Sequence, residues 1–367
     1  MSTSPSLNFA VAERPDRASD ADRDAVLASP GFGQHFTDHM ALATWRKGEG
    51  WGDPRVTAYG PLQLDPSAAV LHYAQEIFEG MKAYRHEDGS VWTFRPEANA
   101  ARFSRSAHRL ALPALDEADF LESLRALVRT DVDWVPATGG EESLYLRPFM
   151  FASESFLGVR PANEVTYCVI ASPAGAYFSG GLKPVSLWIS EHYSRAGVGG
   201  TGAAKCGGNY ASSLAAQVEA AENGCDQSVF LDSVEQKYIE ELGGMNVFLV
   251  YKDGRIVTPE LSGSILEGVT RSSILELAKD LDLTPEERRI TLEEWRAGAE
   301  SGEITEAFAC GTAAVITPVG RMVSTEGEFR TGPEGEGGPV ATKIRETLLA
   351  IQTGRAEDTR GWLTRLA

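Results

Sequence analysis

Hydrophobic residues follow two different spacings along the chain. In some stretches they alternate with polar residues, which predicts half-buried strands, and in others they recur every three or four positions, which predicts amphipathic helices. In the N-terminal half the patterns predict strands at 57–59, 91–94, 143–150 and 164–171 and helices at 96–110 and 117–132. This mixture of short strands and helices is typical of an α+β domain.

The same two spacings continue in the C-terminal half. They predict a strand at 185–189, a helix at 211–222 that ends before Gly224, a strand pair around the Asp253-Gly254 turn, helices near 272–281 and 292–299, and a closing strand pair within 308–319. Thr291 and Glu294 form a capping box at the start of the second of these helices.

Changes in composition divide the chain into parts. Residues 1–30 are polar and rich in Ser, Pro and Asp, which predicts a flexible arm, and residues 174–184 include a glycine-rich stretch typical of a connector. A length of 367 residues also favours two domains over one. We therefore expect a small N-terminal α+β domain at 31–173 and a larger C-terminal domain at 185–367.

The charge balance narrows the classes of partner. Fifty-two acidic against 34 basic residues give a net charge of −18, which would repel nucleic acid and anionic membranes. We find no signal peptide and no run of about 18 apolar residues. The four cysteines lack C-x-x-C spacing, and the six histidines show no pattern that completes a metal site. We expect a cytoplasmic protein with reduced thiols, no metal, no nucleic-acid partner and no membrane association.

Glycines crowd around Lys205, with six of them within residues 197–208. Gly197, Gly199 and Gly202 match the spacing of a dinucleotide-binding fingerprint, but no helical pattern begins at the third glycine, as that motif requires. A P-loop also fails, because alanine precedes the lysine and cysteine stands where Ser or Thr should hold magnesium. Two interpretations of this lysine remain: a nucleophile that forms Schiff bases, or a surface lysine in a flexible loop.

Three further segments have both a functional and a structural interpretation. They are the helix start at Gly268-Val269-Thr270, the helix face with Arg102, Arg105 and Arg109, and the carboxylate pair Glu240-Glu241 in an apolar strand. The helix start, with Thr270 at the cap position, offers amides to a phosphate or is an ordinary cap. Likewise, the arginines could form a salt-bridged stripe, and the carboxylates, which are costly to bury unpaired, could form a structural ion pair.

Six motifs follow one another along the chain. They are Phe78-Glu79-Gly80-Met81-Lys82, Tyr145-Leu146-Arg147-Pro148, Lys205-Cys206-Gly207-Gly208-Asn209-Tyr210, Glu241-Leu242-Gly243-Gly244-Met245-Asn246, Gly268-Val269-Thr270-Arg271 and Cys310-Gly311-Thr312-Ala313-Ala314. In order and spacing they resemble the branched-chain amino-acid aminotransferases, which are fold-type IV pyridoxal-phosphate enzymes. The resemblance extends from about Phe32 to the C-terminus. It implies a smaller N-terminal α+β domain and a larger, mixed, barrel-like C-terminal domain, joined by a glycine-rich interdomain loop.

The resemblance implies a role for each matching residue. Lys205 matches the lysine that forms a Schiff base with pyridoxal 5′-phosphate and then moves the proton, Glu241 the carboxylate facing the pyridine nitrogen, and Tyr210 the phenol near the ring oxygen. The other implied cofactor contacts are Arg102, Val269, Thr270 and Thr312 around the phosphate, and Arg195 close to the cofactor. The implied substrate contacts are Tyr73, Phe78, Tyr145, Tyr177, Gly244, Thr312 and Ala313.

The resemblance also implies a homodimer, in which Tyr73, Leu157 and Val159 contribute across the subunit interface. A C-x-x-C redox switch that some members carry is missing, because Ala314 and Thr317 occupy its positions. Thiol control of that kind is therefore not expected.

The predicted reaction is transamination between leucine, isoleucine or valine and 2-oxoglutarate. A pocket that accepts both an aliphatic side chain and the acidic side chain of glutamate needs a cation at its edge. We expect that cation to be Arg147, which shares a strand face with Tyr145, although a structural ion pair is the alternative. We also expect Pro148 to disfavour a central position for this strand.

Other functions remain as alternatives. A D-amino-acid aminotransferase or a pyridoxal-phosphate lyase of the same fold would keep the lysine and the glutamate. A catalytically silent relative would have no need to keep Lys205, Glu241, Tyr210 and Arg102 together. A dinucleotide-dependent dehydrogenase rests only on the glycine spacing before the lysine.

Overall fold

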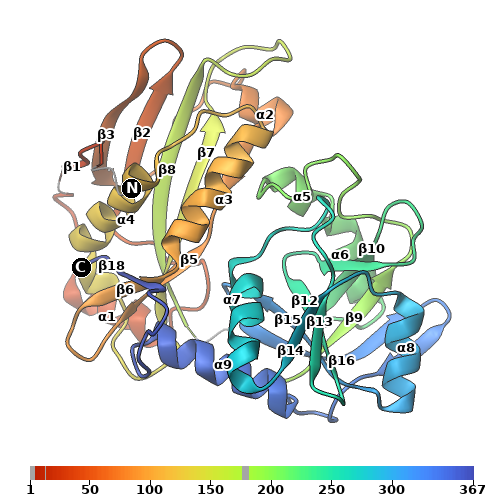
Figure 1. Ribbon diagram of the computed structural model, residues 1–367. Coiled ribbons are helices and arrows are strands. Elements are labelled where there is room, and N and C mark those ends of the chain that lie inside the picture. The colour runs from red at the N-terminus through yellow and green to blue at the C-terminus, as the bar shows by residue number, and fades with distance from the viewer. Residues whose placement is uncertain (1–4, 13, 176–181) are drawn as a thin grey trace. The chain divides into compact units, whose positions relative to one another are not determined.

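The computed structural model describes residues 5–12, 14–175 and 182–367, so the predicted substrate contact Tyr177 lies outside the described residues. The chain forms two compact units, whose elements are labelled in Figure 1. Unit 1 comprises Met1–Tyr177, Ala204–Gly207 and Ala350–Ala367, and unit 2 comprises Phe178–Ala203 and Gly208–Leu349. The C-terminal domain expected at 185–367 is therefore interrupted, because the segment with Lys205 and the end of the chain belong to unit 1.

Among the described residues, unit 1 contains a sheet of nine strands. In order of pairing they are β1 (Ala10–Val11), β3 (Gly50–Ala58), β2 (His39–Arg46), β8 (Glu164–Ala174), β7 (Ser143–Ala152), β5 (Met81–Arg85), β6 (Val91–Phe94) and β18 (Leu363–Arg365), and β4 (Glu76–Phe78) also pairs with β7. Strands β1 and β3 pair in parallel, whereas the other pairings are antiparallel. The end of the chain thus completes the sheet that its first half builds.

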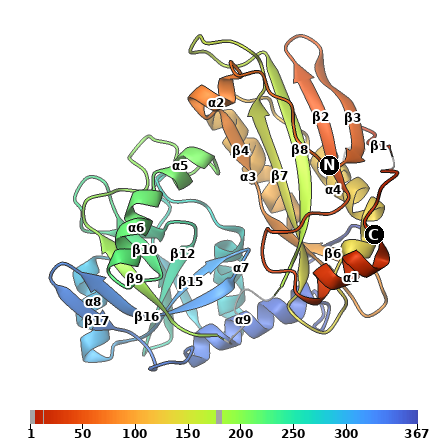
Figure 2. The same ribbon diagram turned by 180° about the vertical axis from the view of Figure 1, so that it is seen from behind.

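Helices α3 (Pro96–Arg109) and α4 (Glu117–Thr130) cover one face of this sheet in Figure 1, and Figure 2 shows the sheet from the other side. Both helices lie where the hydrophobic spacing predicts them. Their apolar faces form a buried aromatic cluster, in which the ring of Phe103 lies 5.4 Å from that of Phe120 and 5.8 Å from that of Tyr167. Unit 1 also contains α1 (Asp20–Ala28), α2 (Ala69–Tyr73) and a 3-10 turn at Val132–Trp134.

Residues 5–12 pack against the rest of unit 1, although the composition of residues 1–30 predicts a flexible arm. Leu7 and Phe9 are buried in the core of this unit. The backbone N–H groups of Ser6 and Leu7 donate to the carboxylate of Asp119 at 2.6 and 2.7 Å. Two apolar side chains and one distant carboxylate are enough to anchor a segment whose overall composition is polar.

Strand β7 is central although it contains Pro148. Strand β8 pairs along one side of it, while β5 and β4 share the other side, with pairings at Leu146 and Phe149 respectively. Pro148 lies between those two pairings, and its carbonyl oxygen accepts the N–H of Glu79 at 2.7 Å. Its missing N–H therefore costs little at this point of the ladder. The expectation that Pro148 keeps the strand from the centre is wrong.

In the part of unit 2 that the structure describes there is a second sheet of nine strands, and this sheet is mixed. The strands in order are β11 (Ile239–Leu242), β10 (Gln227–Leu231), β9 (Val185–Ser190), β16 (Val315–Ser324), β15 (Ile304–Gly311), β12 (Asn246–Tyr251), β13 (Arg255–Thr258) and β14 (Thr284–Glu287), with β17 (Gly327–Arg330) paired to β16. Strand β9 runs parallel to both neighbours, whereas β12 and β15 pair antiparallel. The mixed sheet expected for the C-terminal half is confirmed.

Helices of unit 2 lie close to their predicted positions. They are α6 (Leu214–Glu222), α7 (Val269–Ala278), the 3-10 turn Lys279–Leu281 and α8 (Leu292–Ser301). The short α5 (Gly207–Ala211) and the longer α9 (Pro339–Gln352) each contain residues of both units. The backbone N–H of Glu294 donates to Thr291 Oγ at 2.9 Å, which confirms the cap at the start of α8.

The described parts of the chain contain no helix that is long and apolar enough to cross a membrane. Within the same residues, no group of three or more His, Cys, Asp or Glu side chains could hold a metal ion. All four cysteines are free and buried. Burial raises the pKa of the Cys168 thiol to about 12, so this group stays protonated at neutral pH.

Candidate active site

The backbone of Lys205 is held from both sides within unit 1. Its N–H donates to Ser106 Oγ on α3 at 2.9 Å, and its carbonyl oxygen accepts the N–H of Phe78 at 3.0 Å. Two residues further along, the N–H of Gly207 donates to the carboxylate of Glu76 on β4. The lysine is therefore not a surface residue in a loose loop, and its Nζ lies 4.8 Å from the centre of the Phe78 ring.

Two glycines of the stretch around the lysine allow close packing. A Cβ at Gly207 would collide with the Glu76 carboxylate, and one at Gly202 would collide with the backbone of Ser264 in unit 2. No helix begins at Gly202, since α5 starts only at Gly207. The dinucleotide-like spacing is therefore a coincidence. Of its three glycines, Gly202 is needed for close packing, and Gly199 has a positive φ of 72° that favours glycine.

Arg102 forms a buried ion pair with Glu79. Its Nε and Nη2 lie 2.7 and 2.8 Å from the two carboxylate oxygens, and Asn99 donates a further hydrogen bond at 2.7 Å. Burial alone would raise the pKa of Glu79, but the charges of Arg102 and Lys205 and the hydrogen bonds from Arg102 and Asn99 together outweigh it and lower the pKa below the usual 4.5. Arg105 and Arg109 are exposed on the same helix, so only Arg102 of the predicted cationic face points inward.

Aromatic rings and one cation gather on β4 and β7. The guanidinium carbon of Arg147 lies 4.8 Å from the Phe78 ring centre and 5.3 Å from that of Tyr145, and its Nη2 donates to the Tyr145 hydroxyl at 3.1 Å. Its buried Nε has no hydrogen-bond partner among the described residues. Gly80 is required here, because a Cβ would collide with the Tyr145 hydroxyl. The structure thus brings three predicted substrate contacts together.

Glu241 lies in a buried polar network of unit 2. Its Oε1 is 2.7 Å from Arg195 Nη1 and accepts the N–H of Leu266 at 2.7 Å. Asn246 Nδ2 lies 3.4 Å from its other oxygen. The same Nη1 of Arg195 also donates to the carbonyl oxygen of Ser264 at 3.2 Å. Of the two neighbouring carboxylates predicted to need a cation, Glu241 is the one that pairs directly with an arginine.

Helix α7 begins with uncapped amides. Gly268 occupies its N-cap position and, in the described structure, makes no side-chain cap hydrogen bond. The expectation that Thr270 caps the helix is wrong, because Thr270 lies in the first turn, after Val269. The first N–H groups of a helix have no acceptor within the helix, so this end of α7 can bind an anion.

Two turns carry the remaining predicted contacts of unit 2. Thr312 and Ala313 lie in the turn that joins β15 to β16. A Cβ at Gly311, where β15 ends, would lie 3.3 Å from Met245 Cγ, so this turn packs against the turn after β11. A Cβ at Gly244 would lie 3.7 Å from the Tyr210 ring, which places that ring beside the second turn.

Three predicted contacts lie on the surface of unit 1. The Tyr73 hydroxyl donates to the carbonyl oxygen of Leu157, so these two residues do lie together. The side chains of Leu157 and Val159 are exposed, with 65% and 86% of their surface accessible. Apolar side chains this accessible are compatible with a surface that a second chain covers.

The residues that position Lys205 and Arg102 were not predicted as site residues from the sequence. Glu79 lies inside the first motif, and Ser106 lies four residues after Arg102 on α3, so the helical period places Ser106 and Arg102 on one face. Glu76 precedes the first motif by two positions. These positions carried a weak signal, because their partners lie far away in the sequence.

Comparison with known proteins gives concordant findings. The family model described as Amino-transferase class IV matches residues 76–322. The branched-chain-amino-acid aminotransferase of Mycolicibacterium smegmatis is 58% identical over 363 residues, which cover 98% of each chain. The Escherichia coli branched-chain amino acid aminotransferase superposes with a TM-score of 0.73 at 30% identity, covering 89% of this chain and 100% of the other. The branched-chain aminotransferase of the archaeon Thermoproteus uzoniensis, solved with norvaline, superposes with a TM-score of 0.71 at 28% identity, covering 89% of this chain and 100% of that one.

Proposed function

Because the chain belongs to the class IV aminotransferases, and within them to the branched-chain-amino-acid aminotransferases, we propose that it uses pyridoxal 5′-phosphate to transfer amino groups between branched-chain L-amino acids and 2-oxoglutarate. The substrates would be leucine, isoleucine and valine, and the products their 2-oxo acids and glutamate. The observation that carries this proposal is the placement of Lys205, whose backbone is held by Ser106 and Phe78 beside an aromatic ring.

The residues present fit this cofactor. A lysine held on a glycine-flanked segment suits covalent attachment, and the uncapped start of α7 at Val269 and Thr270 suits a phosphate. Arg195 is buried, and its Nε has no partner among the residues described. We assign phosphate contacts to Arg102, Val269, Thr270 and Thr312, and further cofactor contacts to Arg195 and Tyr210.

A bound pyridoxal phosphate supplies an electrophilic carbon and a ring that accepts electrons. Lys205 Nζ would hold that carbon and then move the proton at the α-carbon of the substrate. Glu241 would face the pyridine nitrogen, and its carboxylate is kept in place by Arg195 and by the N–H of Leu266. This fixed negative charge would favour a protonated ring nitrogen.

For substrates, we assign the side-chain pocket to Tyr73, Phe78, Tyr145, Arg147 and Tyr177, and the α-carboxylate to Gly244, Thr312 and Ala313. The rings of Phe78 and Tyr145 offer an apolar wall to leucine. Arg147 stands against both rings and would pair with the γ-carboxylate of glutamate.

We further propose that the enzyme is a cytoplasmic homodimer, in which Tyr73, Leu157 and Val159 meet the partner chain. The exposure of Leu157 and Val159 supports this assignment. Light scattering at assay concentration tests it, and a fully active monomer would refute it.

Two measurements test the reaction. Borohydride reduction of the cofactor-loaded protein followed by peptide mapping should give a pyridoxyl adduct on Lys205, and Lys205→Ala should lose both the adduct and turnover. A panel of L- and D-amino acids with 2-oxoglutarate, read as kcat/KM, should favour L-leucine, L-isoleucine and L-valine. Preferred turnover of D-amino acids would instead favour the D-amino-acid aminotransferase of the same fold.

A further inference from the structure

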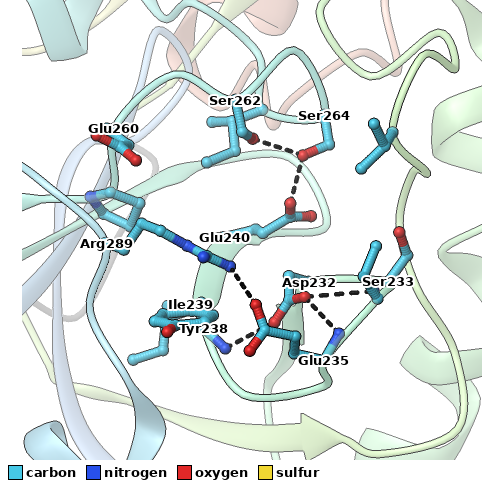
Figure 3. Close-up of a pocket in the computed structure, with 14 residues that line it drawn as sticks. Asp232, Ser233, Glu235, Tyr238, Ile239, Glu240, Glu260, Ser262, Ser264 and Arg289 are labelled. Atoms are coloured by element: carbon cyan, nitrogen blue, oxygen red, sulfur yellow. Dashed lines mark hydrogen bonds and ion pairs between the residues drawn. The ribbon is translucent and has the colours of Figure 1, made fainter.

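The charged groups around a pocket of about 350 Å³ in unit 2, drawn in Figure 3, already have partners. Asp232 accepts four backbone N–H groups of the turn that follows it, at 2.7 to 3.2 Å. Arg289 pairs with Glu235 at 3.2 Å. The hydroxyl of Ser264 donates to Glu240, as a dashed line marks in Figure 3. A charged group that lacks such a partner lies in unit 1.

This group is Arg147, which forms no ion pair among the described residues. Its Nη2 donates to the Tyr145 hydroxyl at 3.1 Å, and its Nε is buried without a partner in the described structure. Its guanidinium carbon lies 4.8 and 5.3 Å from the ring centres of Phe78 and Tyr145. A cation against apolar rings is costly to desolvate further when no negative charge is near it. An aliphatic side chain on the same rings would add to that cost.

Glu76 is placed to supply the negative charge. Strand β4 pairs with β7, and Glu76 lies opposite Phe151 in this pairing. Side chains two positions apart on a strand share a face, and so do directly opposite side chains. Glu76 and Phe78 therefore face the same side of the sheet as Arg147, which lies four positions before the partner of Glu76 on β7.

The carboxylate of Glu76 is half-buried and held from one side. Its Oε1 accepts the backbone N–H of Gly207, and no group of the described residues donates to its Oε2. Burial raises the pKa of Glu76 above the usual 4.5, whereas the N–H of Gly207 and the charge of Arg147 oppose this rise. The attraction between Glu76 and Arg147 acts through space, because no direct ion pair joins them. Glu76 therefore offsets the charge of the arginine without occupying its donors.

We propose that Glu76 is a specificity-determining residue, which balances the charge of Arg147. When an aliphatic side chain lies on the rings of Phe78 and Tyr145, Glu76 supplies the counter-charge, so the arginine can remain beside an apolar group. When glutamate or 2-oxoglutarate binds, its γ-carboxylate pairs with Arg147 and is moderately repelled by Glu76. The residue thereby limits the preference for acidic substrates. This inference rests on the proposed function, because it assumes that both kinds of side chain use this aromatic wall.

Glu76→Gln tests the proposal, because glutamine removes the charge but keeps an acceptor for the N–H of Gly207. The probes are glutarate and 4-methylvalerate, which resemble 2-oxoglutarate and the 2-oxo acid of leucine but lack the oxo group and do not react. Titration calorimetry with the cofactor-loaded protein gives their dissociation constants. We expect the preference for glutarate over 4-methylvalerate to rise by about fivefold or more in the variant. Effects on the cofactor or on the α-carboxylate are common to both probes and cancel in this ratio.

Two comparisons separate a role through Arg147 from a general effect of charge. Glu49→Gln, an exposed residue between β2 and β3, makes the same change in net charge and should leave the ratio within about twofold. The corresponding ratio of kcat/KM for glutamate over leucine extends the test to Arg147→Met, in which binding is weak. In that background Glu76→Gln should change the ratio by less than about twofold, because nothing then holds the γ-carboxylate beside Glu76.

An unchanged ratio after Glu76→Gln, or equal changes with and without Arg147, would overturn the proposal. If Glu76→Gln does not fold, Glu76→Ser removes the same charge and makes room for a water at the N–H of Gly207. It should shift the ratio in the same direction, and an unchanged ratio there would also overturn the proposal. Failure of the parent protein to bind either probe would contradict the proposed function and this inference with it, whereas an unchanged ratio would leave that function intact.

Discussion

Replacing Arg147 by methionine should separate the two kinds of substrate that we propose for one pocket. Methionine keeps a long apolar stem but removes the charge and the hydrogen bonds. In the structure the guanidinium lies 4.8 Å from the Phe78 ring centre and donates to the Tyr145 hydroxyl at 3.1 Å. The variant therefore changes the charge beside the aromatic wall while leaving the wall itself in place.

The expected loss follows from the partial burial of Arg147. Two unit charges about 4 Å apart interact by about 4 kcal/mol at the effective dielectric constant of a protein surface. Truncating one partner of a desolvated charge pair costs about 2–5 kcal/mol. Because this side chain is only partly buried, solvent screening favours the lower end, about 2 kcal/mol, or roughly 30-fold in kcat/KM for glutamate and 2-oxoglutarate. Leucine carries no side-chain charge and should lose less than about threefold.

The stability of the variant should change little. Each lost cation–π contact costs about 0.5–1 kcal/mol, but the substitution also removes an Nε that is buried without a partner among the described residues. Steady-state kinetics with leucine and glutamate, together with melting temperatures, provide the assay. Arg46→Met, a half-exposed arginine of β2 paired with Glu164, is the matched control and should affect neither substrate. Equal losses for leucine and glutamate, or a lower melting temperature without selective loss, would show that Arg147 supports the fold.

Three further variants probe the groups that hold the site. Ser106→Ala leaves the N–H of Lys205 without its acceptor and should lower the free energy of unfolding by about 1–3 kcal/mol in urea titrations. Ser104→Ala on the same helix should not lower it, and equal effects of the two variants would show that Ser106 does not hold the backbone of Lys205. Glu241→Gln should lower kcat by more than it lowers cofactor affinity, and an unchanged kcat would show that another group faces the ring nitrogen. Glu79→Gln should cost about 3–5 kcal/mol, because it leaves a buried arginine uncompensated. The pKa of Glu79 is lowered from 4.5, so its ion pair stabilises the folded protein above about pH 4.5, and this stabilisation is lost as the pH falls through the folded-state pKa. In the variant, the free energy of unfolding should therefore fall less steeply toward acid pH. The same pH dependence in the variant and the parent protein would refute this role of Glu79.

Local patterns determined much of this fold from the sequence alone. The hydrophobic period located α3, α4 and α8, and the capping box at Thr291 marked the start of α8, because these features depend on residues a few positions apart. The order of six motifs identified the family, since several short motifs in a fixed order are far more specific than any one of them.

Only the tertiary structure decided which distant residues meet. Ser106 and Lys205 lie 99 positions apart, and Glu76 and Gly207 lie 131 apart, yet these pairs hold the lysine segment in unit 1. Packing also anchored Leu7 although the N-terminal segment is polar in composition. Periodicity describes which side of an element is apolar, but the partner of each polar group depends on long-range packing, which no local pattern encodes.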